Sequence, residues 1–160
     1  MITIRPILPE DATPIMRIAA AEPLFIAEEV DCVEELLRDY FGRPDHNGYF
    51  FLTAQFDGKV AGFACYGPKA LTSGTYDLFW IAVGRDFARR GVGRALMAHV
   101  EAAVRQLSGR LILVDTSGKQ AYTATRAFYE SLGYSRVATI PEFYAPGDDL
   151  VIYLRRVDGA

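Results

Sequence analysis

The sequence has few of the residues that bind metals or cross-link secreted proteins. Its 160 residues include two cysteines, two histidines and one tryptophan. Cys32 and Cys65 are far apart in the chain and have no metal-ligand spacing. Together with His46 and His99 they are too few for a zinc site. We therefore expect no bound metal, no disulfide framework and a cytoplasmic location.

The sequence also lacks a long apolar run and an excess of basic charge. No stretch approaches the roughly 20 apolar residues that span a bilayer, and residues 1–6 do not have the pattern of a signal peptide. Seventeen basic side chains against 20 acidic ones give a net charge of −3, which argues against non-specific nucleic-acid binding. With 51% hydrophobic residues and no repeat or linker, we expect one soluble domain over residues 1–160, without membrane or nucleic-acid partners.

Hydrophobic periodicity predicts a mixed α/β fold. The expected helices cover residues 11–21, 30–42, 91–107 and 121–132. The expected strands cover residues 2–7, 49–55, 59–66, 75–83, 111–114, 135–140 and 150–155. Asp57 and Gly58 predict a hairpin turn, and residues 145–149 a loop. Because the run 75–83 is apolar on both sides, we expect a central strand covered on both faces.

The stretch from residue 83 to residue 96 carries the strongest chemical signal. It leaves the central strand, turns, and opens a helix with Gly91 and Gly93 two positions apart. Helix N-termini present free N–H groups and a positive dipole end to anions, and glycine lets an anion approach the backbone closely. Three arginines lie around the same point: Arg89, Arg90 and Arg94. The pattern predicts a phosphate-rich ligand; the alternative is a solvated arginine-rich turn.

Two common phosphate-binding motifs are excluded. The segment has no Gly-Lys-Ser/Thr sequence, so it is not a P-loop. Leu96 stands where a dinucleotide-binding fingerprint has its third glycine. Residues 85–94 carry four arginines and one aspartate, a local charge of +3 in a chain whose total is −3. A single small polyanion fits this distribution better than a long one.

The same segment resembles the acyl-CoA-binding motif of the GNAT superfamily of N-acyltransferases, Gln/Arg-x-x-Gly-x-Gly/Ala. Gly91 and Gly93 match the two small positions, whereas Ala88 stands where the family usually has Gln or Arg. The preceding strand and residues 125–134 (TRAFYESLGY) resemble two further GNAT segments, in the right order. The resemblance implies the GNAT fold, an α/β (α+β) fold with a single central mixed, mostly antiparallel sheet of about seven strands and about four helices.

The resemblance also implies an acetyl-CoA-dependent N-acetyltransferase, in which an amine attacks the thioester directly. Its cofactor-binding residues would be Ile81, Ala82, Val83, Ala88, Arg89, Arg90, Gly91, Val92, Gly93, Arg94 and Tyr129. The pantetheine amides would pair with the backbone of residues 81–83, and a nearby N–H would polarise the thioester carbonyl. Tyr122 stands where many members have an asparagine that touches the CoA arm.

Two residues are candidates for proton transfer. An alkylamine has a pKa of about 10, so it arrives protonated and needs a base. Asp77 stands where many members carry a catalytic glutamate, and its shorter arm favours transfer through water. Tyr129 matches the tyrosine that protonates the leaving thiolate. It is about 100° from Phe128 around the helix, so its hydroxyl can face a cleft while Phe128 packs in the core. The alternatives are a structural carboxylate and a core or rim tyrosine.

The acceptor is the least determined part. Acidic residues gather in the segment 22–39, and Asp148 and Asp149 lie in the second loop that shapes the acceptor site in this fold. An acidic entrance would favour a cationic amine; the alternative is a solvated helix face. Four aromatic residues could equally line an apolar pocket: Phe25, Tyr40, Phe143 and Tyr144. The leading hypothesis is a small primary amine. The alternatives are a protein lysine or N-terminus, and a non-catalytic acyl-CoA sensor; the chain could also form a homodimer.

Overall fold

The computed structural model describes residues 1–159, apart from the side chain of Asn47. In chain order the elements are β1 (Ile2–Pro6), α1 (Ala12–Ala21), α2 (Ala27–Gly42), β2 (Phe50–Phe56), β3 (Lys59–Pro68), β4 (Thr75–Val83), α3 (Val92–Gln106), β5 (Leu111–Ser117), α4 (Thr123–Ser131), β6 (Ser135–Ala145) and β7 (Asp148–Arg156).

The sheet has the order β1-β2-β3-β4-β5-β7-β6. β4 and β5 are parallel, whereas β1–β2, β2–β3, β5–β7 and β6–β7 are antiparallel. The predicted mixed sheet of seven strands with four helices is confirmed.

The chain divides into two compact units. Residues 1–67 and 79–102 form unit 1, and residues 68–78 and 103–160 form unit 2. β4 contributes its second half to unit 1 and its first half to unit 2. The expectation of one domain over residues 1–160 stays a prediction.

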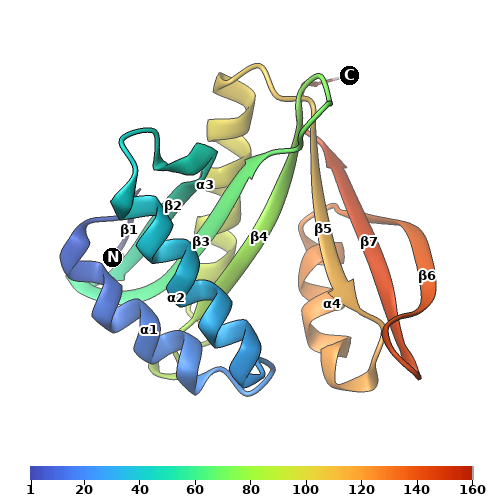
Figure 1. Cartoon of the computed structure of the whole chain (residues 1–160), viewed down its shortest axis with the longest axis horizontal. Helices are drawn as coiled ribbons and strands as arrows, with labels where there is room; N and C mark the ends of the chain where they lie inside the picture. The colour runs from blue at the N-terminus through green and yellow to red at the C-terminus, as the bar shows by residue number, and fades with distance from the viewer. Residues whose placement is uncertain (160) are drawn as a thin grey trace. The chain divides into compact units, whose positions relative to one another are not determined.

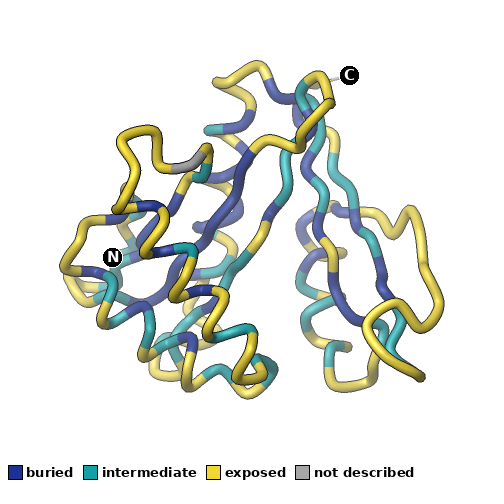
Figure 2. Tube along the Cα trace, in the orientation of Figure 1, coloured by how far each residue is buried: buried dark blue, intermediate teal, exposed yellow. Residues whose placement is uncertain are grey.

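In unit 1, α1 and α2 cover one face of the strands, and α3 lies behind them (Figure 1). Ile15 of α1 and Val33 of α2 are fully buried in one cluster with Phe63 of β3. Side chains alternate across a strand, so the neighbours of Phe63 point to the α3 side. A Cβ at Gly62 would lie 2.8 Å from the carbonyl oxygen of Ala82. This close approach requires glycine at position 62, and Figure 2 shows β3 buried along most of its length.

The turn between β2 and β3 has the predicted form. Asp57 and Gly58 both adopt left-handed φ angles, 48° and 79°, which is the signature of a type I′ turn. Phe56 and Lys59 face each other as the last pair of the hairpin. The local sequence therefore determines this connection.

In unit 2, α4 covers one face of β5 and β7. Val114 is in register with Tyr153, and both are buried. The Tyr129 ring of α4 lies 6.1 Å from the Tyr153 ring. The opposite face is less covered, since Leu113 and Ile152 are half-buried. β6 is exposed throughout (Figure 2).

Two structural expectations are corrected. β4 is not covered on both faces, because Phe79 remains 38% exposed and Asp77 is half-buried. An apolar run shows that a strand is hydrophobic, but it does not show whether helices cover both of its faces. The segment 145–149 is not an open loop, because Ala145 pairs with Asp148 in a tight hairpin. Gly147 permits that turn with a φ of 78°.

Among the described helices, none combines the length and the apolarity needed to cross a membrane.

Candidate functional site

The junction between β4 and α3 forms a backbone turn suited to an anion. The Gly84 N–H donates to the carbonyl of Ala61 at 2.8 Å, and a 3₁₀ turn follows over Arg85–Phe87. Arg89 and Gly91 then adopt left-handed φ angles of 60° and 82°. The Ala95 N–H donates to the carbonyl of Gly91 at 3.0 Å. This is the first hydrogen bond of α3, so the N–H groups of its first turn have no intrahelical acceptor and can bind an anion.

Backbone conformation explains why glycine stands at position 91. A Cβ added there would meet only the side chain of Ile2, at 3.9 Å. Space is therefore ample, and the restriction comes from the left-handed φ angle. The neighbouring Arg89 adopts a left-handed φ angle without being glycine, which carries a strain of about 1–2 kcal/mol. Strain of this kind is concentrated at functional sites.

The arginines of the junction are on the surface. Arg89, Arg90 and Arg94 are all exposed, and the Arg90 guanidinium lies 5.3 Å above the ring of Phe56. This contact orients Arg90 without neutralising its charge. Ala88 is exposed and has an extended backbone. Since its methyl group offers no hydrogen bond, an anion here would be bound by the backbone and the arginines.

The strand end that precedes the junction lies in the same unit. Ala82 is buried, and Ile81 and Val83 are half-buried. Unit 1 therefore brings all the predicted cofactor-binding residues of positions 81–94 into one continuous strand–turn–helix segment.

In unit 2, Asp77 faces an ammonium group. Its Oδ2 atom lies 3.7 Å from Nζ of Lys69, and the two side chains are 19% and 54% exposed. Asp77 is in register with Leu113 of β5, so Asp115 lies two residues further along on the same face. Partial burial of its carboxyl and the negative charge of Asp77 raise the pKa of Asp115 above its usual 3.8, and Lys69 opposes this.

Sequence patterns did not indicate Lys69 or Asp115. Lys69 lies in a polar loop segment, where a lysine carries no signal. Asp115 directly follows the buried run 111–114. An acidic residue at the end of a buried strand could have marked Asp115 as a candidate site residue. Strand register places Asp115 on the face of Asp77, and the β3–β4 connection brings Lys69 to Asp77.

Tyr129 is more buried than expected. It is 4% exposed, whereas Phe128 is half-buried, the reverse of the expected packing. The reason is that α4 turns Tyr129 toward β7, where its ring lies between those of Tyr134 and Tyr153 at 5.9 and 6.1 Å. Burial raises the pKa of Tyr129 well above the usual 10. A tyrosine phenol is protonated at neutral pH with or without this shift, and a proton donor requires that state.

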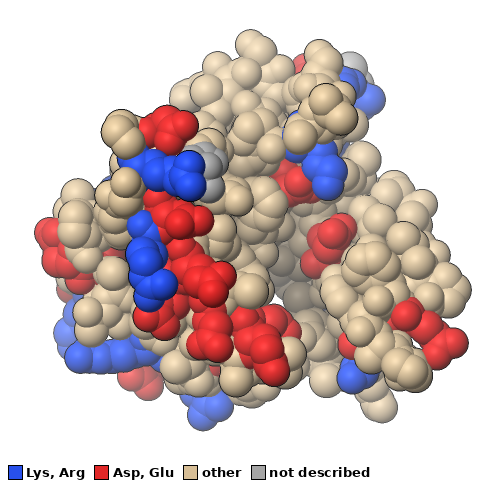
Figure 3. All heavy atoms as spheres, in the orientation of Figure 1, with Lys and Arg blue, Asp and Glu red and all other residues tan. Residues whose placement is uncertain are grey.

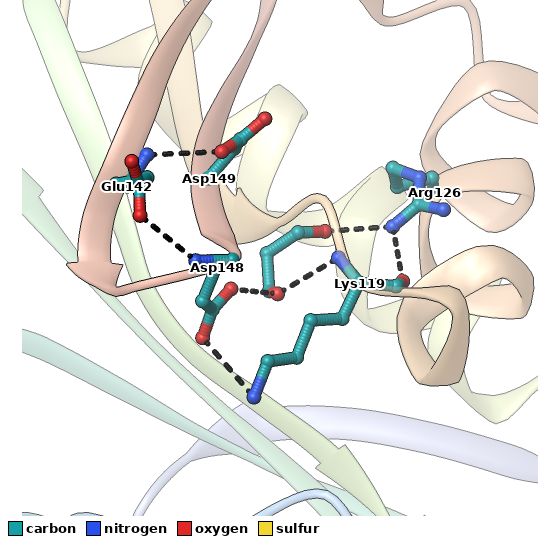
Figure 4. A network of polar contacts seen from close by, with 7 residues as sticks. Lys119, Arg126, Glu142, Asp148 and Asp149 are labelled. Carbon is teal, nitrogen blue, oxygen red and sulfur yellow. Dashed lines mark hydrogen bonds and ion pairs between the residues drawn. The ribbon is translucent and has the colours of Figure 1, made fainter.

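The two acids of the β6–β7 turn are engaged in structural contacts (Figure 4). The Ser117 hydroxyl donates to Asp148 at 2.5 Å, and Nζ of Lys119 lies 3.7 Å from the same carboxylate. Asp149 accepts the backbone N–H of Glu142 at 2.9 Å. Both aspartates are half-buried. Asp148 ties the turn to the end of β5 and Asp149 ties it to β6, so both carboxylates are engaged within the protein.

The acids of residues 22–39 lie mostly along the exposed side of α2, with basic side chains beside them (Figure 3). Glu34 pairs with Arg38 at 3.2 Å. This arrangement is typical of a solvated helix face.

Two of the four aromatic candidates for an acceptor pocket pack in the core of unit 1. Phe25 makes an edge-to-face contact with Trp80 at 5.4 Å, and Tyr40 is buried. Phe143 and Tyr144 of β6 are 56% and 47% exposed.

A groove of about 820 Å³ runs between α1 and α2. Its lining residues are Ala12, Thr13, Met16, Arg17, Ala20, Glu34, Leu37, Arg38, Phe41 and Gly42. None of them is a predicted site residue. In the part of the chain that the structure describes, no group of three or more His, Cys, Asp or Glu side chains could hold a metal ion.

Fold and site together define a class of protein. A mixed sheet whose fourth strand leads through a glycine turn into a helix start with free N–H groups is the arrangement expected of an acyl-CoA-dependent acyltransferase. The model of the Acetyltransferase (GNAT) family matches residues 14–134. The chain therefore belongs to the GNAT family, and it is an N-acetyltransferase of that family.

Known proteins are similar to this chain over most of its length. A GNAT-family protein from Desulfovibrio desulfuricans is 42% identical, covers 98% of this chain and 99% of its own, and superposes with a TM-score of 0.94. A 5-NmdU N-acetyltransferase of Pseudomonas phage PaMx11 is 27% identical over 84% of this chain and 88% of its own. The [ribosomal protein bS18]-alanine N-acetyltransferase of Salmonella typhimurium is 34% identical over 68% of this chain and 69% of its own.

An acetyltransferase structure that contains its cofactor is also similar. An acetyltransferase from Salmonella typhimurium solved with acetyl-CoA has a TM-score of 0.78 at 20% identity, and the match covers 99% of this chain and 95% of that one. At this identity the likeness shows the fold alone. The family as a whole uses acetyl-CoA as acetyl donor.

Proposed function

We propose that this chain transfers an acetyl group from acetyl-CoA to a primary amine, with a small molecule as the leading acceptor. The observation that carries the proposal is the strand–turn–helix junction of unit 1. Its left-handed Arg89 and Gly91 expose backbone N–H groups at the start of α3. Three arginines surround it with positive charge. These features suit the pyrophosphate of a coenzyme A thioester.

In this proposal the residues of positions 81–83 and 88–94 bind the donor. The backbone of Ile81, Ala82 and Val83 pairs with the pantetheine arm as an added strand does. The junction N–H groups and the arginines hold the phosphates, and Ala88 contributes through its backbone. Acetyl-CoA supplies an activated acyl group with a thiolate as leaving group.

Asp77 and Tyr129 perform the proton transfers. Asp77 takes a proton from the acceptor ammonium, directly or through one water. Its contact with Lys69 supports this role, because it demonstrates that an ammonium group can approach the carboxylate. Tyr129 donates a proton to the departing thiolate and also contacts the donor. Its phenol carries a proton at neutral pH, as a proton donor must, and burial raises its pKa above the usual 10.

A protein N-terminus is the second candidate acceptor. It is favoured by the relatives named [ribosomal protein bS18]-alanine N-acetyltransferases, of which one is 37% identical over 93 residues. The acidic residues of the β6–β7 turn do not favour one acceptor over the other, because Asp148 and Asp149 are engaged in contacts of their own. A panel of small amines and N-terminal peptides, assayed for release of the CoA thiol, distinguishes the two.

We further propose that residues 1–160 form one acyltransferase domain with a cytoplasmic location. The family match over residues 14–134 supports a single domain, because it includes parts of both units. A homodimer is supported by the exposed edge strand β6, in which Val137, Ile140 and Phe143 are 43–56% exposed. Light scattering of the purified chain tests the dimer.

The decisive experiment is ligand-dependent thermal stability. Acetyl-CoA should raise the melting temperature, whereas NAD and ATP at the same concentration should not, because binding to the folded state alone stabilises it. No shift with acetyl-CoA would overturn the proposal at its first step.

A further inference from the structure

We propose that Lys69 is a self-acetylation site of this enzyme. The inference rests on the proposed function, in which Asp77 is the base. Any acceptor amine must then lie within hydrogen-bond reach of Asp77, directly or through one water. Nζ of Lys69 lies 3.7 Å from Oδ2 of Asp77. An amine of the chain itself therefore occupies a position that the acceptor must reach.

The fold holds the backbone of Lys69 in place and leaves its side chain accessible. The Lys69 N–H donates to the carbonyl of Thr75 at 2.8 Å, and the Lys69 carbonyl accepts the Thr72 hydroxyl at 2.8 Å. Thr75 and Asp77 are two residues apart on β4, so they lie on the same face of the strand. The side chain is 54% exposed, and it can therefore move to accept a new group.

The reaction needs no group beyond those already proposed. Asp77 removes a proton from the Lys69 ammonium, and the neutral Nζ attacks the carbonyl carbon of the thioester. A carbon–nitrogen bond forms, the attacking nitrogen loses its second proton to solvent, and the carbon–sulfur bond breaks. Asp77 returns its proton to solvent. The sulfur leaves with the electron pair and takes a proton from Tyr129, which regains one from solvent. The products are Nε-acetyllysine and coenzyme A.

Acetylation would change the charge around the proposed base. The modified side chain is neutral, so the positive charge beside Asp77 disappears. Because Lys69 lowers the pKa of Asp115, that pKa would rise further. The modification would thus alter the electrostatics that a cationic acceptor meets.

The chain supplies its own matched control. It has three lysines, Lys59, Lys69 and Lys119. Nζ of Lys119 also lies 3.7 Å from a carboxylate, that of Asp148, and its side chain is 53% exposed. Lys69 and Lys119 therefore have nearly the same exposure, 54% and 53%, and the same ion-pair distance. They differ in that only Lys69 is paired with the proposed base.

The test is a time course with deuterated acetyl-CoA and the full chain. After digestion, mass spectrometry measures the label on each lysine and on the N-terminal amine. Positioned base catalysis contributes a factor of about 100 or more, so Lys69 should be labelled at least that much faster than Lys119 and Lys59. The rate per molecule should not depend on protein concentration, since the transfer is intramolecular. Equal labelling of Lys69 and Lys119 would overturn the inference.

Two variants separate this inference from the proposed function. Asp77→Asn should slow the labelling of Lys69 about 100-fold and leave the labelling of Lys119 unchanged; circular dichroism verifies its fold. If Asp77→Asn loses transfer to an external amine while wild-type Lys69 labels no faster than Lys119, only the Lys69 inference fails. If external transfer is unchanged in Asp77→Asn, the proposed base is wrong. Lys119→Arg should leave the Lys69 label intact, and loss of that label would mean that the two sites are not independent.

Discussion

Asp11 and Arg5 form a bidentate ion pair in unit 1, with nitrogen–oxygen distances of 2.6 and 2.9 Å. The Asp11 carboxylate is buried and also accepts the N–H of Leu8 at 2.8 Å and the hydroxyl of Thr53 at 2.9 Å. Burial pushes the pKa of Asp11 up, but the hydrogen bonds from Arg5, Leu8 and Thr53 outweigh it, and the pKa lies below the usual 3.8. The pair joins the start of α1 to β1 and β2.

The first prediction is that Asp11→Asn lowers the free energy of unfolding by about 3–5 kcal/mol, because it leaves a partly buried Arg5 without its carboxylate. The native pKa is depressed, so the stabilisation is complete above pH 3.8 and is lost as the pH falls through the lower native value. The difference between wild type and variant should therefore shrink in acid. Urea unfolding between pH 7 and pH 2 measures it.

The control for this variant is Asp31→Asn, at an exposed position of α2. It should change stability by less than about 0.5 kcal/mol. A loss below about 1 kcal/mol in Asp11→Asn at neutral pH, within the range of an ordinary neutral hydrogen bond, would contradict the prediction.

The second prediction concerns Gly91, whose φ is 82°. Gly91→Ala should cost about 1–2 kcal/mol of stability, because an L-residue is strained in the left-handed region. It should also weaken acetyl-CoA binding, since the strain is relieved by moving the N–H groups that face the anion. Gly42→Ala is the control, because Gly42 has open space around its Cβ position and no left-handed φ. Thermal unfolding and titration calorimetry measure both effects; equal losses in the two variants would contradict the argument.

Much of the architecture could be predicted from the sequence, because its signals are local. Asp57 and Gly58 determine the β2–β3 turn, and the apolar spacing of α3 marks a helix whose observed bounds, Val92–Gln106, lie within one residue of the expected ones. The glycines of the β4–α3 junction likewise indicated a turn there, and Gly91 adopts the left-handed φ that such a turn uses. Such features need only neighbouring residues in the chain.

The contacts of the candidate site could not be predicted, because they depend on strand register and packing. Lys69 meets Asp77 through the β3–β4 connection, and Asp115 joins them through the pairing of β4 with β5. The burial of Tyr129, in place of Phe128, depends on how α4 is rotated against β7. A helical spacing gives the angle between two side chains but not which of them faces the sheet.

The third prediction is that Arg90→Glu weakens acetyl-CoA binding more than it lowers turnover at saturating donor. Arg90 lies in the β4–α3 turn and over Phe56, and in the proposed function it supplies charge for phosphate binding but takes no part in proton transfer. A contact made equally in the ground and transition states changes KM and not kcat. Arg17→Glu makes the same charge change at an exposed position of α1 and should leave KM and kcat unchanged. Unaltered affinity in Arg90→Glu would remove Arg90 from the donor site.

The fourth prediction is that Tyr129→Phe lowers turnover by about 100-fold or more, the usual contribution of a positioned proton donor, with little change in acetyl-CoA affinity. Burial is the cause of the raised pKa of Tyr129, and phenylalanine preserves the buried ring. The melting temperature should therefore change little, and a loss of activity would report on the hydroxyl.

Tyr153→Phe is the matched control for this variant. Tyr153 is equally buried, and its hydroxyl donates to Glu130 at 2.7 Å. Its removal should cost about 1 kcal/mol or more of stability and leave turnover intact. The two variants should thus separate a hydroxyl that acts in catalysis from one that acts in folding. Steady-state kinetics with an acceptor from the amine panel measures turnover; if Tyr129→Phe keeps wild-type turnover, Tyr129 is not the acid, and the proton for the thiolate must come from elsewhere.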